Sequence, residues 1–215
     1  MRLKNKVALI TGGSSGIGKA ITELFVKEGA KVAIADINKI QGQRTASENK
    51  CIFVFCDISN ENHVEKASNS TISSYGKIDI LVNCAANLGG PNNVVNITTK
   101  EWRDVLSVSL DGVFYCSKHI MPELIKTGSG SIINISSVEG MLGAFGHSAY
   151  VTAKSGLFGL TKSMAIDFGK FNIRVNSISP GIIDSERPDI KKLKKNVNIM
   201  KFWRDMTVLE RLGKP

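Results

Sequence analysis

Long apolar runs are absent from this sequence, and their absence bears on where the protein works. No stretch approaches the roughly 18 apolar residues that a membrane-spanning helix needs. The first apolar run, Val7–Ile10, lasts four residues before Thr11 and Gly12 interrupt it. The core of a secretory signal peptide needs about 7–15 apolar residues. We therefore predict a cytoplasmic protein that has no membrane partner.

Cysteine and histidine are scarce, which bears on metals and disulfides. The cysteines have neither the spacing of a zinc knuckle nor that of a redox pair, and the histidines share no ligand-like spacing. These residues are Cys51, Cys56, Cys84 and Cys116, together with His63, His119 and His147. We therefore predict reduced thiols and no metal site.

Composition and charge are those of a globular protein with a basic excess. Of the 215 residues, 42% are hydrophobic and 22% are charged, which excludes a disordered chain. The formal charge is +9, and nine basic residues against four acidic ones lie between Glu186 and Pro215. No recognition motif and no aromatic-interleaved basic stripe accompanies this cluster. We favour a solvated helix face there and predict no nucleic-acid partner.

Short β-branched runs alternate with longer helical patterns along the whole chain. The runs are Val7–Thr11, Lys31–Ala35, Ile52–Cys56, Ile78–Asn83, Ser131–Ser136 and Ile173–Ile178. We interpret all six as continuously apolar, which is typical of parallel strands covered by helices on both faces. The pattern predicts a single domain over residues 1–215. Its fold class is α/β, a Rossmann-type doubly wound parallel sheet of order 3-2-1-4-5-6 in three αβα layers.

Two helix boundaries can be predicted from local signals. Thr98 and Glu101 have the spacing of a capping box, ahead of an apolar stripe at helical period. Pro122 is expected near the end of the helix that follows.

The first predicted strand leads directly into a glycine-rich turn, Thr11 to Gly18, and then into a helix. Glycine lets the backbone approach a pyrophosphate, and a helix N-terminus supplies free N–H groups and a partial positive charge. Gly18-Lys19-Ala20 lacks the hydroxyl residue of an ATP-binding loop. We predict a dinucleotide site that includes Gly12, Ser14, Ser15, Gly16, Ile17 and Gly18.

Asp36 ends the second predicted strand, 18 residues after Gly18. An acid there can accept hydrogen bonds from an adenosine ribose and would repel a 2′-phosphate. No Lys or Arg occupies positions 14, 15 or 37, and Lys39 is the nearest base. We therefore predict NAD rather than NADP, with Asp36 and Ile37 at the ribose.

The glycine turn and the sequence Tyr150-Val-Thr-Ala-Lys154 together resemble the short-chain dehydrogenase/reductase family, in its compact branch. The resemblance continues through Cys56-Asp57-Ile58, Asn83-Cys84-Ala85-Ala86, Ile135-Ser136-Ser137 and Pro180-Gly181 with Ser185. It implies that further cofactor contacts come from Asp57, Ile58, Asn83, Ala85, Ala86, Pro180, Gly181, Ile183 and Ser185.

Tyr150 and Lys154 lie one helical turn apart. An unperturbed phenol has a pKa of about 10, too high for an efficient base near neutrality, and a neighbouring ammonium stabilises the phenolate. We therefore predict that Lys154 lowers the pKa of Tyr150, the general acid/base. The resemblance implies that Lys154 also binds the nicotinamide ribose and that Ser137 orients the substrate oxygen, with Ser136 as the competing serine. His147, three residues before Tyr150, either lines the pocket or belongs to an ordinary loop.

Three departures from the family pattern affect these expectations. Ser109 stands where the family commonly has an asparagine that completes a proton relay, so we expect a catalytic role for Ser109 through water, with slower relay. Ala86 replaces a glycine beside the cofactor. The sequence ends at Pro215, whereas the resemblance implies a further helix and a seventh strand. Without them we expect the strand Ile173–Ile178 to be an exposed sheet edge, with reduced stability and a tendency to aggregate.

The segment 186–206 reads either as a lid over the substrate or as an amphipathic helix packed on the core. With Val138–Phe145 it would form a mainly apolar pocket wall. We predict hydride transfer between NAD(H) and a small-molecule secondary alcohol or ketone. The alternatives are a 3-oxoacyl (carrier protein) reductase and a non-catalytic NAD-binding interaction module. A homo-oligomer is expected if the C-terminal segment is present.

Overall fold

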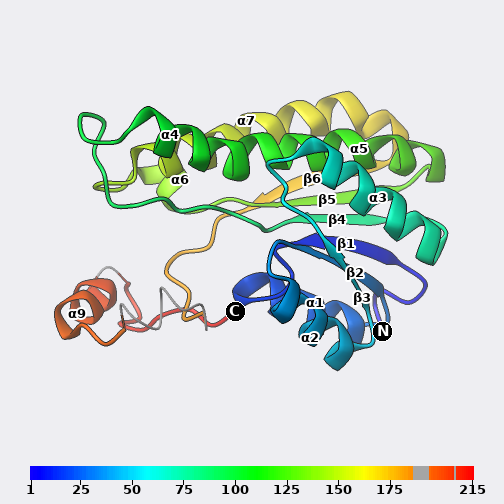
Figure 1. The fold of residues 1–215 in the computed structure, drawn as a ribbon, viewed down its shortest axis with the longest axis horizontal. Helices are drawn as coiled ribbons and strands as arrows, with labels where there is room; N and C mark the ends of the chain where they lie inside the picture. Colours follow the sequence, from blue (N-terminus) through cyan, green and yellow to red (C-terminus); the bar gives the residue numbers. More distant parts are fainter. Residues whose placement is uncertain (186–193, 206) are drawn as a thin grey trace.

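Six parallel strands form one sheet in the order β3-β2-β1-β4-β5-β6, as the sequence predicts (Figure 1). The computed structural model describes residues 1–185, 194–205 and 207–215, without the side chains of residues 202 and 203. The strands are β1 (Val7–Thr11), β2 (Lys31–Asp36), β3 (Ile52–Phe55), β4 (Ile80–Asn83), β5 (Gly130–Ile135) and β6 (Ile173–Ile178). Each begins and ends within two residues of its predicted bounds.

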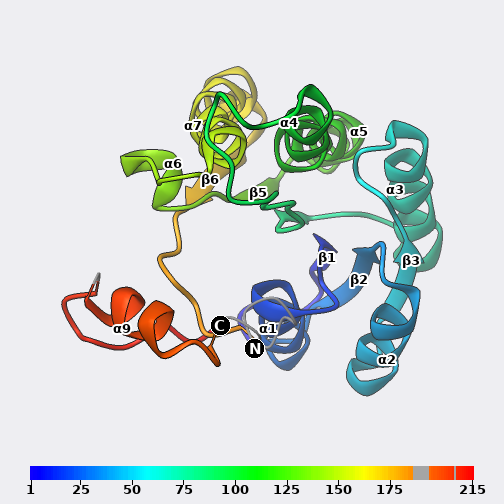
Figure 2. The same ribbon diagram turned by 60° about the vertical axis from the view of Figure 1, so that its left-hand side comes forward.

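Helices cover both faces of the sheet. They are α1 (Gly16–Lys27), α2 (Lys39–Asn49), α3 (Glu61–Tyr75), α4 (Thr99–Leu106), α5 (Gly112–Thr127), α6 (Glu139–Leu142), α7 (Ser148–Phe168) and α9 (Val197–Asp205). Figure 2 shows α1 and α2 on one face and α3, α5 and α7 on the other. A π-helical turn, Ser107–Asp111, joins α4 to α5. The arrangement is that of a doubly wound α/β fold.

The local signals for helix boundaries were right at one position and wrong at another. The capping box is present, because Thr98 Oγ1 accepts from the Glu101 N–H at 3.1 Å and the Glu101 carboxylate accepts from the Thr98 N–H at 3.0 Å. Pro122 does not end its helix, since α5 continues to Thr127. The buried residues Met121 and Leu124 flank the proline. Their packing offsets the hydrogen bond that proline cannot make.

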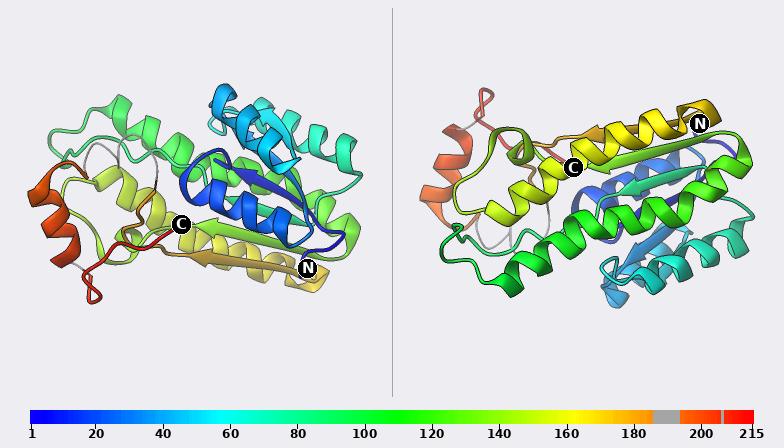
Figure 3. Two further views of the ribbon diagram at one scale, coloured as in Figure 1. Left: turned by 90° about the horizontal axis from the view of Figure 1, so that it is seen from below. Right: turned by 90° about the horizontal axis from the view of Figure 1, so that it is seen from above.

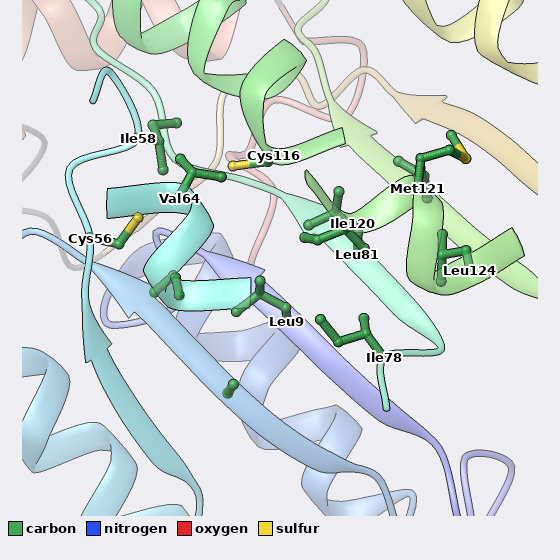
Figure 4. Close-up of a cluster of buried hydrophobic side chains, with 14 of the residues drawn as sticks. Leu9, Cys56, Ile58, Val64, Ile78, Leu81, Cys116, Ile120, Met121 and Leu124 are labelled. Atoms are coloured by element: carbon green, nitrogen blue, oxygen red, sulfur yellow. The ribbon is translucent and has the colours of Figure 1, made fainter. Parts of the chain in front are cut away.

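One part of the hydrophobic core lies between the sheet and the helices α3 and α5, and another lies on the opposite face, toward α1 and α2. Figure 4 shows Leu9 and Leu81 of the sheet facing Val64 of α3 and Ile120 and Leu124 of α5. These side chains are almost completely removed from solvent. Their burial fixes the sheet and thereby the loops at the carboxyl ends of its strands.

The two outer strands depart from the predicted burial on both faces. β3 is only partly buried. In β6, Ile173 and Val175 are buried while Arg174 and Asn176 are exposed, and Ile178 is 51% exposed. In the described part of the chain β6 pairs with β5 alone. An edge strand has one neighbour and is less completely covered, which explains the alternation.

The carboxyl ends of the strands point toward α6 and α9 (Figure 3). The predicted lid segment falls here, but residues 186–193 and 206 lie outside the described residues. Of the remainder, α9 forms a helix beyond the sheet, and its first residue, Val197, is exposed. Among the helices of the described ranges, none is both long and apolar enough to cross a membrane.

Candidate active site

The glycine-rich turn follows β1 and brings three backbone segments into close approach. Gly12 has a φ of +65°, and a Cβ placed on it would lie 2.8 Å from the Cα of Ala85. A Cβ on Gly18 would lie 2.1 Å from the carbonyl oxygen of Gly12. Real Cβ atoms do not approach other atoms so closely, so glycine is required at both positions. The N-terminus of α1 is thereby left open to a ligand.

Thr11 connects the two strands on either side of this crevice. Its hydroxyl accepts from the N–H groups of Cys84 and Ala85 at 3.0 and 3.2 Å. β1 and β4 are neighbours in the sheet, and the strand order reverses beside β1. In open α/β sheets, ligands bind at such a switch point. The predicted cofactor residue Ala85 therefore lies directly beside the glycine turn.

Asp36 is buried at the end of β2 and accepts three hydrogen bonds. Its Oδ2 accepts from the backbone N–H of Ser14 at 3.1 Å and also from the Ser14 hydroxyl, while Oδ1 accepts from the Asn38 N–H at 2.9 Å. A carboxylate has about four lone-pair sites. About one acceptor site therefore remains for a ligand such as a ribose hydroxyl. The neighbouring Ile37 is exposed.

Asp57 and Ile58 occupy the loop after β3. Asp57 Oδ1 accepts from the Ser59 N–H at 3.0 Å and from its hydroxyl at 2.6 Å. The Ile58 side chain is buried in the core, and a Cβ on Gly112 of α5 would lie 2.7 Å from it. The side chain of Ile58 is thus committed to packing, which leaves its backbone for any contact with a cofactor.

Asn83, predicted as a cofactor residue, places its side chain inside the protein. Its Nδ2 donates to Asn134 Oδ1 at 2.9 Å and to the Ser117 hydroxyl at 3.5 Å. Asn134 in turn donates to the hydroxyl of Thr161 at 2.9 Å. This buried chain joins β4 and β5 to α5 and α7. The Asn83 side chain therefore holds the sheet against the helices, and only its backbone lies at the crevice.

Ser136 and Ser137 use their hydroxyls differently. Ser136 donates its single proton to the backbone carbonyl of Lys154 at 2.8 Å. Ser137 accepts from the N–H of Glu139 at 3.1 Å, which uses a lone pair and leaves its O–H as a donor. Because of this difference, Ser137 and not Ser136 has a proton to offer a substrate oxygen.

Lys154 and Tyr150 lie on one face of α7. Lys154 is 2% exposed, and its Nζ donates to the carbonyl of Ile135 at 2.6 Å. The same Nζ lies 5.6 Å from the centroid of the Tyr150 ring. Burial lowers the pKa of Lys154 to about 8, because removal from water penalises the charged form. The structure thus brings the three residues Ser137, Tyr150 and Lys154 to the carboxyl end of β5.

Ser109 lies in the π-helical turn and is completely buried. Its hydroxyl donates to the carbonyl of Asn87 at 2.9 Å and accepts from the Asn87 N–H at 3.0 Å. The one proton of the hydroxyl is therefore used to hold the loop after β4. For the predicted water relay, this leaves the hydroxyl one acceptor lone pair. The contact partner Asn87 had no signal in the sequence.

The segment after β6 runs beside the end of β5. The carbonyl of Pro180 accepts from the Val138 N–H at 3.1 Å, while Gly181 has open space where a side chain would be. Ile183 pairs with Gly213, and Ser185 is buried. Pro180 therefore lies beside the segment that carries Ser137.

His147 and Glu139 form a pair that the sequence did not reveal. Nδ1 of His147 lies 2.9 Å from Oε2 of Glu139. His147 also lines, with Tyr150 and Glu101, a hollow of about 10 Å³, close to the smallest space that holds one water molecule. Within the described ranges, no group of three or more His, Cys, Asp or Glu side chains is placed to hold a metal ion.

Comparison with known proteins places this geometry in a family. The short chain dehydrogenase model matches residues 6–195. Secoisolariciresinol dehydrogenase of Forsythia intermedia is 39% identical over 184 residues, which cover 83% of this chain and 66% of that protein. (+)-Borneol dehydrogenase 2 of Salvia officinalis is 41% identical over 185 residues, which cover 84% of this chain and 65% of that protein.

A solved structure agrees with this assignment. The 3-ketoacyl-(acyl-carrier-protein) reductase from Brucella melitensis, complexed with NADH, superposes with a TM-score of 0.92 at 31% identity, over 99% of this chain and 87% of that one. This structural neighbour shares the six-stranded parallel sheet with helices on both faces. The chain belongs to the short chain dehydrogenase family, and it spans slightly less than two thirds of the two plant relatives.

Proposed function

We propose that this chain transfers a hydride between NAD(H) and a secondary alcohol or ketone. The observation that carries the proposal is the buried ammonium of Lys154, 5.6 Å from the centroid of the Tyr150 ring. Keeping a charged group buried beside a phenol destabilises the fold. Such an arrangement has a clear use only where the phenol must give up and regain a proton.

The bound nicotinamide would supply the hydride acceptor in oxidation and the hydride donor in reduction. In alcohol oxidation, Tyr150 takes the proton of the substrate hydroxyl as the carbon–hydrogen bond breaks and the carbonyl forms. The Lys154 ammonium stabilises the phenolate before this transfer. Ser137 donates its O–H to the substrate oxygen and so fixes the carbinol carbon in position. In ketone reduction, the proton of Tyr150 goes to the carbonyl oxygen.

The residues of the crevice support NAD as the cofactor. Gly12 and Gly18 allow the close backbone packing that forms the glycine turn at the N-terminus of α1, where a pyrophosphate would bind. The Asp36 carboxylate has about one acceptor site left for a ribose hydroxyl and would repel a 2′-phosphate. Lys39, the nearest base, has its Nζ 4.7 Å from the centroid of the Phe55 ring, a cation–π contact that a 2′-phosphate would have to break. The cytoplasmic location and the homo-oligomeric state stay predictions.

A second candidate function is the reduction of a 3-oxoacyl chain on a carrier protein. The similarity to the Brucella melitensis reductase favours it. The exposed Lys195 would attract an acidic carrier, whereas Lys194 is paired with Asp184 at 2.7 Å. The third reading, an NAD-binding interaction module without turnover, would not need the buried charge of Lys154.

Turnover of a probe alcohol separates these candidates. Purified protein would be titrated with NADH and NADPH by fluorescence and then assayed with NAD and either (+)-borneol or cyclohexanol. We expect Tyr150→Phe to lower kcat at least 100-fold and to leave NADH affinity within about twofold. Ser137→Ala should lower kcat at least tenfold. Turnover that is unaffected by Tyr150→Phe would contradict the proposal.

A further inference from the structure

One ion pair connects the two segments that carry Ser137 and Tyr150. Glu139 begins α6 two positions after Ser137, and its N–H donates to the Ser137 hydroxyl at 3.1 Å. His147 directly precedes α7, three positions before Tyr150. The distance of 2.9 Å between His147 Nδ1 and Glu139 Oε2 closes the link. A displacement of either partner is therefore transmitted to a candidate catalytic hydroxyl.

His147 also contacts Tyr150 directly. The two ring centroids lie 6.4 Å apart with an interplanar angle of 79°, an edge-to-face contact. The carbonyl of His147 accepts from the N–H of Val151 at 2.8 Å, which starts the first turn of α7. The imidazole thus contacts the ring of Tyr150, and the backbone of the same residue starts the helical turn that carries Tyr150.

Apolar burial contributes little to holding the loop between α6 and α7. Leu142 is 85% exposed, and Phe145 is fully exposed. Segments with few buried apolar contacts open at low cost in free energy. The polar contacts of this loop, among them the Glu139–His147 pair and the hydrogen bond from the Ser155 hydroxyl to the Gly140 carbonyl at 2.6 Å, therefore determine its position.

The charges around His147 favour its protonated form. Glu139 of α6 raises the pKa of His147 through its hydrogen bond. Glu101 of α4 lines the same hollow, and its carboxylate accepts hydrogen bonds from Thr98 and Asn92. On the α7 side, the His147 ring contacts the ring of Tyr150. The Lys154 ammonium lies 5.6 Å from the centroid of that phenol ring. A charge-assisted hydrogen bond is roughly twice as strong as a neutral one, so loss of the His147 proton weakens the pair.

We propose that Glu139 and His147 are positioning residues that fix Ser137 and Tyr150 relative to each other. The Glu139–His147 interaction, and with it this positioning, weakens when His147 loses its proton. This inference rests on the proposed function, because it concerns the same candidate catalytic residues. It predicts that kcat falls as the pH rises through the raised pKa of His147.

The kinetic test follows kcat and KM against pH with (+)-borneol and NAD. In the wild-type protein we expect kcat to fall about tenfold across the His147 titration, equivalent to about 1.4 kcal/mol. His147→Asn keeps a neutral donor where Nδ1 lies, so a plot of its kcat against pH should lack this descending limb, that is, the tenfold fall. Glu139→Gln should move the limb to lower pH, because it removes the charge that raises the pKa of His147. A limb that persists unchanged in His147→Asn would overturn the proposal.

A matched control comes from a second histidine–carboxylate pair. His119 Nε2 lies 2.9 Å from Glu61 Oε1 on α5 and α3, outside the residues placed at the crevice. His119→Gln should leave the pH profile unchanged. His147→Ala should lower kcat about tenfold with KM for NAD within twofold. A merely structural role would instead lower the melting temperature and the NAD affinity while leaving kcat unchanged, and that result would also overturn the proposal.

Nuclear magnetic resonance tests the link without any substrate. The chain has three tyrosines and three histidines, so the ring signals of Tyr150 and His147 can be assigned by substitution. The Tyr150 ring signals should shift with the midpoint of the His147 titration in the wild-type protein and should lose that shift in His147→Asn. Tyr150 ring signals that do not change over the pH range of the His147 titration would overturn the proposal. Full turnover by Tyr150→Phe would overturn the proposed function instead, so the two failures are distinguishable.

Discussion

Replacing Lys154 with methionine should change stability and turnover in opposite directions. Burial lowers the pKa of Lys154 from 10.5 to about 8. Each pKa unit corresponds to about 1.4 kcal/mol, so the buried charge costs the folded state about 3 kcal/mol near neutrality. Methionine removes this cost but leaves the Ile135 carbonyl without its donor, which costs about 1–2 kcal/mol. We expect Lys154→Met to raise the free energy of unfolding at pH 7 by about 1–2 kcal/mol.

The pH dependence of this difference gives the decisive measurement. Between about pH 8 and 10.5 the unfolded wild-type chain holds the Lys154 proton that the folded chain has released. Wild-type stability therefore rises with pH in this window because of this group, and the advantage of the variant should vanish and then reverse. Urea unfolding of both proteins from pH 7 to 10.5 measures the difference, in which shared titrations cancel. A difference that is constant over this range would refute the reasoning.

Turnover supplies the second half of the test. Lys154→Met should lower kcat with (+)-borneol and NAD at least 100-fold, since it removes the ammonium that stabilises the Tyr150 phenolate. Lys162 lies on the same helix and is exposed, so Lys162→Met is the matched control and should change neither quantity. A stabilised variant with full turnover would mean that the Lys154 charge has no role in the chemistry.

Three further substitutions test other parts of the crevice. Gly18→Ala, whose Cβ would lie 2.1 Å from the Gly12 carbonyl oxygen, should cost about 3 kcal/mol of stability in urea unfolding, and unchanged NADH binding would argue against the close approach. Asp36→Asn should raise the affinity for NADPH relative to NADH at least tenfold in a fluorescence titration; an unchanged ratio would contradict the choice of NAD. Ser109→Ala removes both hydrogen bonds to Asn87 and should cost about 1–2 kcal/mol of unfolding free energy, which an unaltered denaturation curve would exclude.

Features set by local sequence patterns could be predicted well. The strand order follows from six β-branched runs and the right-handed crossovers that join parallel strands. Gly12 and Gly18 could be predicted because glycine is required wherever backbones approach closely. The position of Asp36 at the end of β2 follows from the same strand pattern. In each case the information lies within a few neighbouring residues.

Features that depend on contacts between distant segments could not be predicted. Asn83 was predicted as a cofactor residue from the family resemblance, and the hydrogen bonds of its side chain to Ser117 and Asn134, 34 and 51 positions away, had no signal in the local sequence. The two hydrogen bonds between Ser109 and Asn87 could not be predicted for the same reason, because these residues lie 22 positions apart. Among the described strands, β6 lies at the sheet edge as expected, and the alternating burial of its side chains follows from that position.

The choice between Ser136 and Ser137 illustrates how the two kinds of information combine. In the sequence, two adjacent serines differ only in their distance from Tyr150. In the extended chain that leaves β5, successive side chains point to opposite sides. Ser136 therefore points to α7 and donates to the Lys154 carbonyl, which helps to fix the turn that carries the ammonium. Ser137 points the other way, keeps its proton, and accepts only from the Glu139 N–H among the hydrogen bonds described. One serine thus helps to position Lys154, while its neighbour keeps the proton that the proposed function assigns to the substrate oxygen.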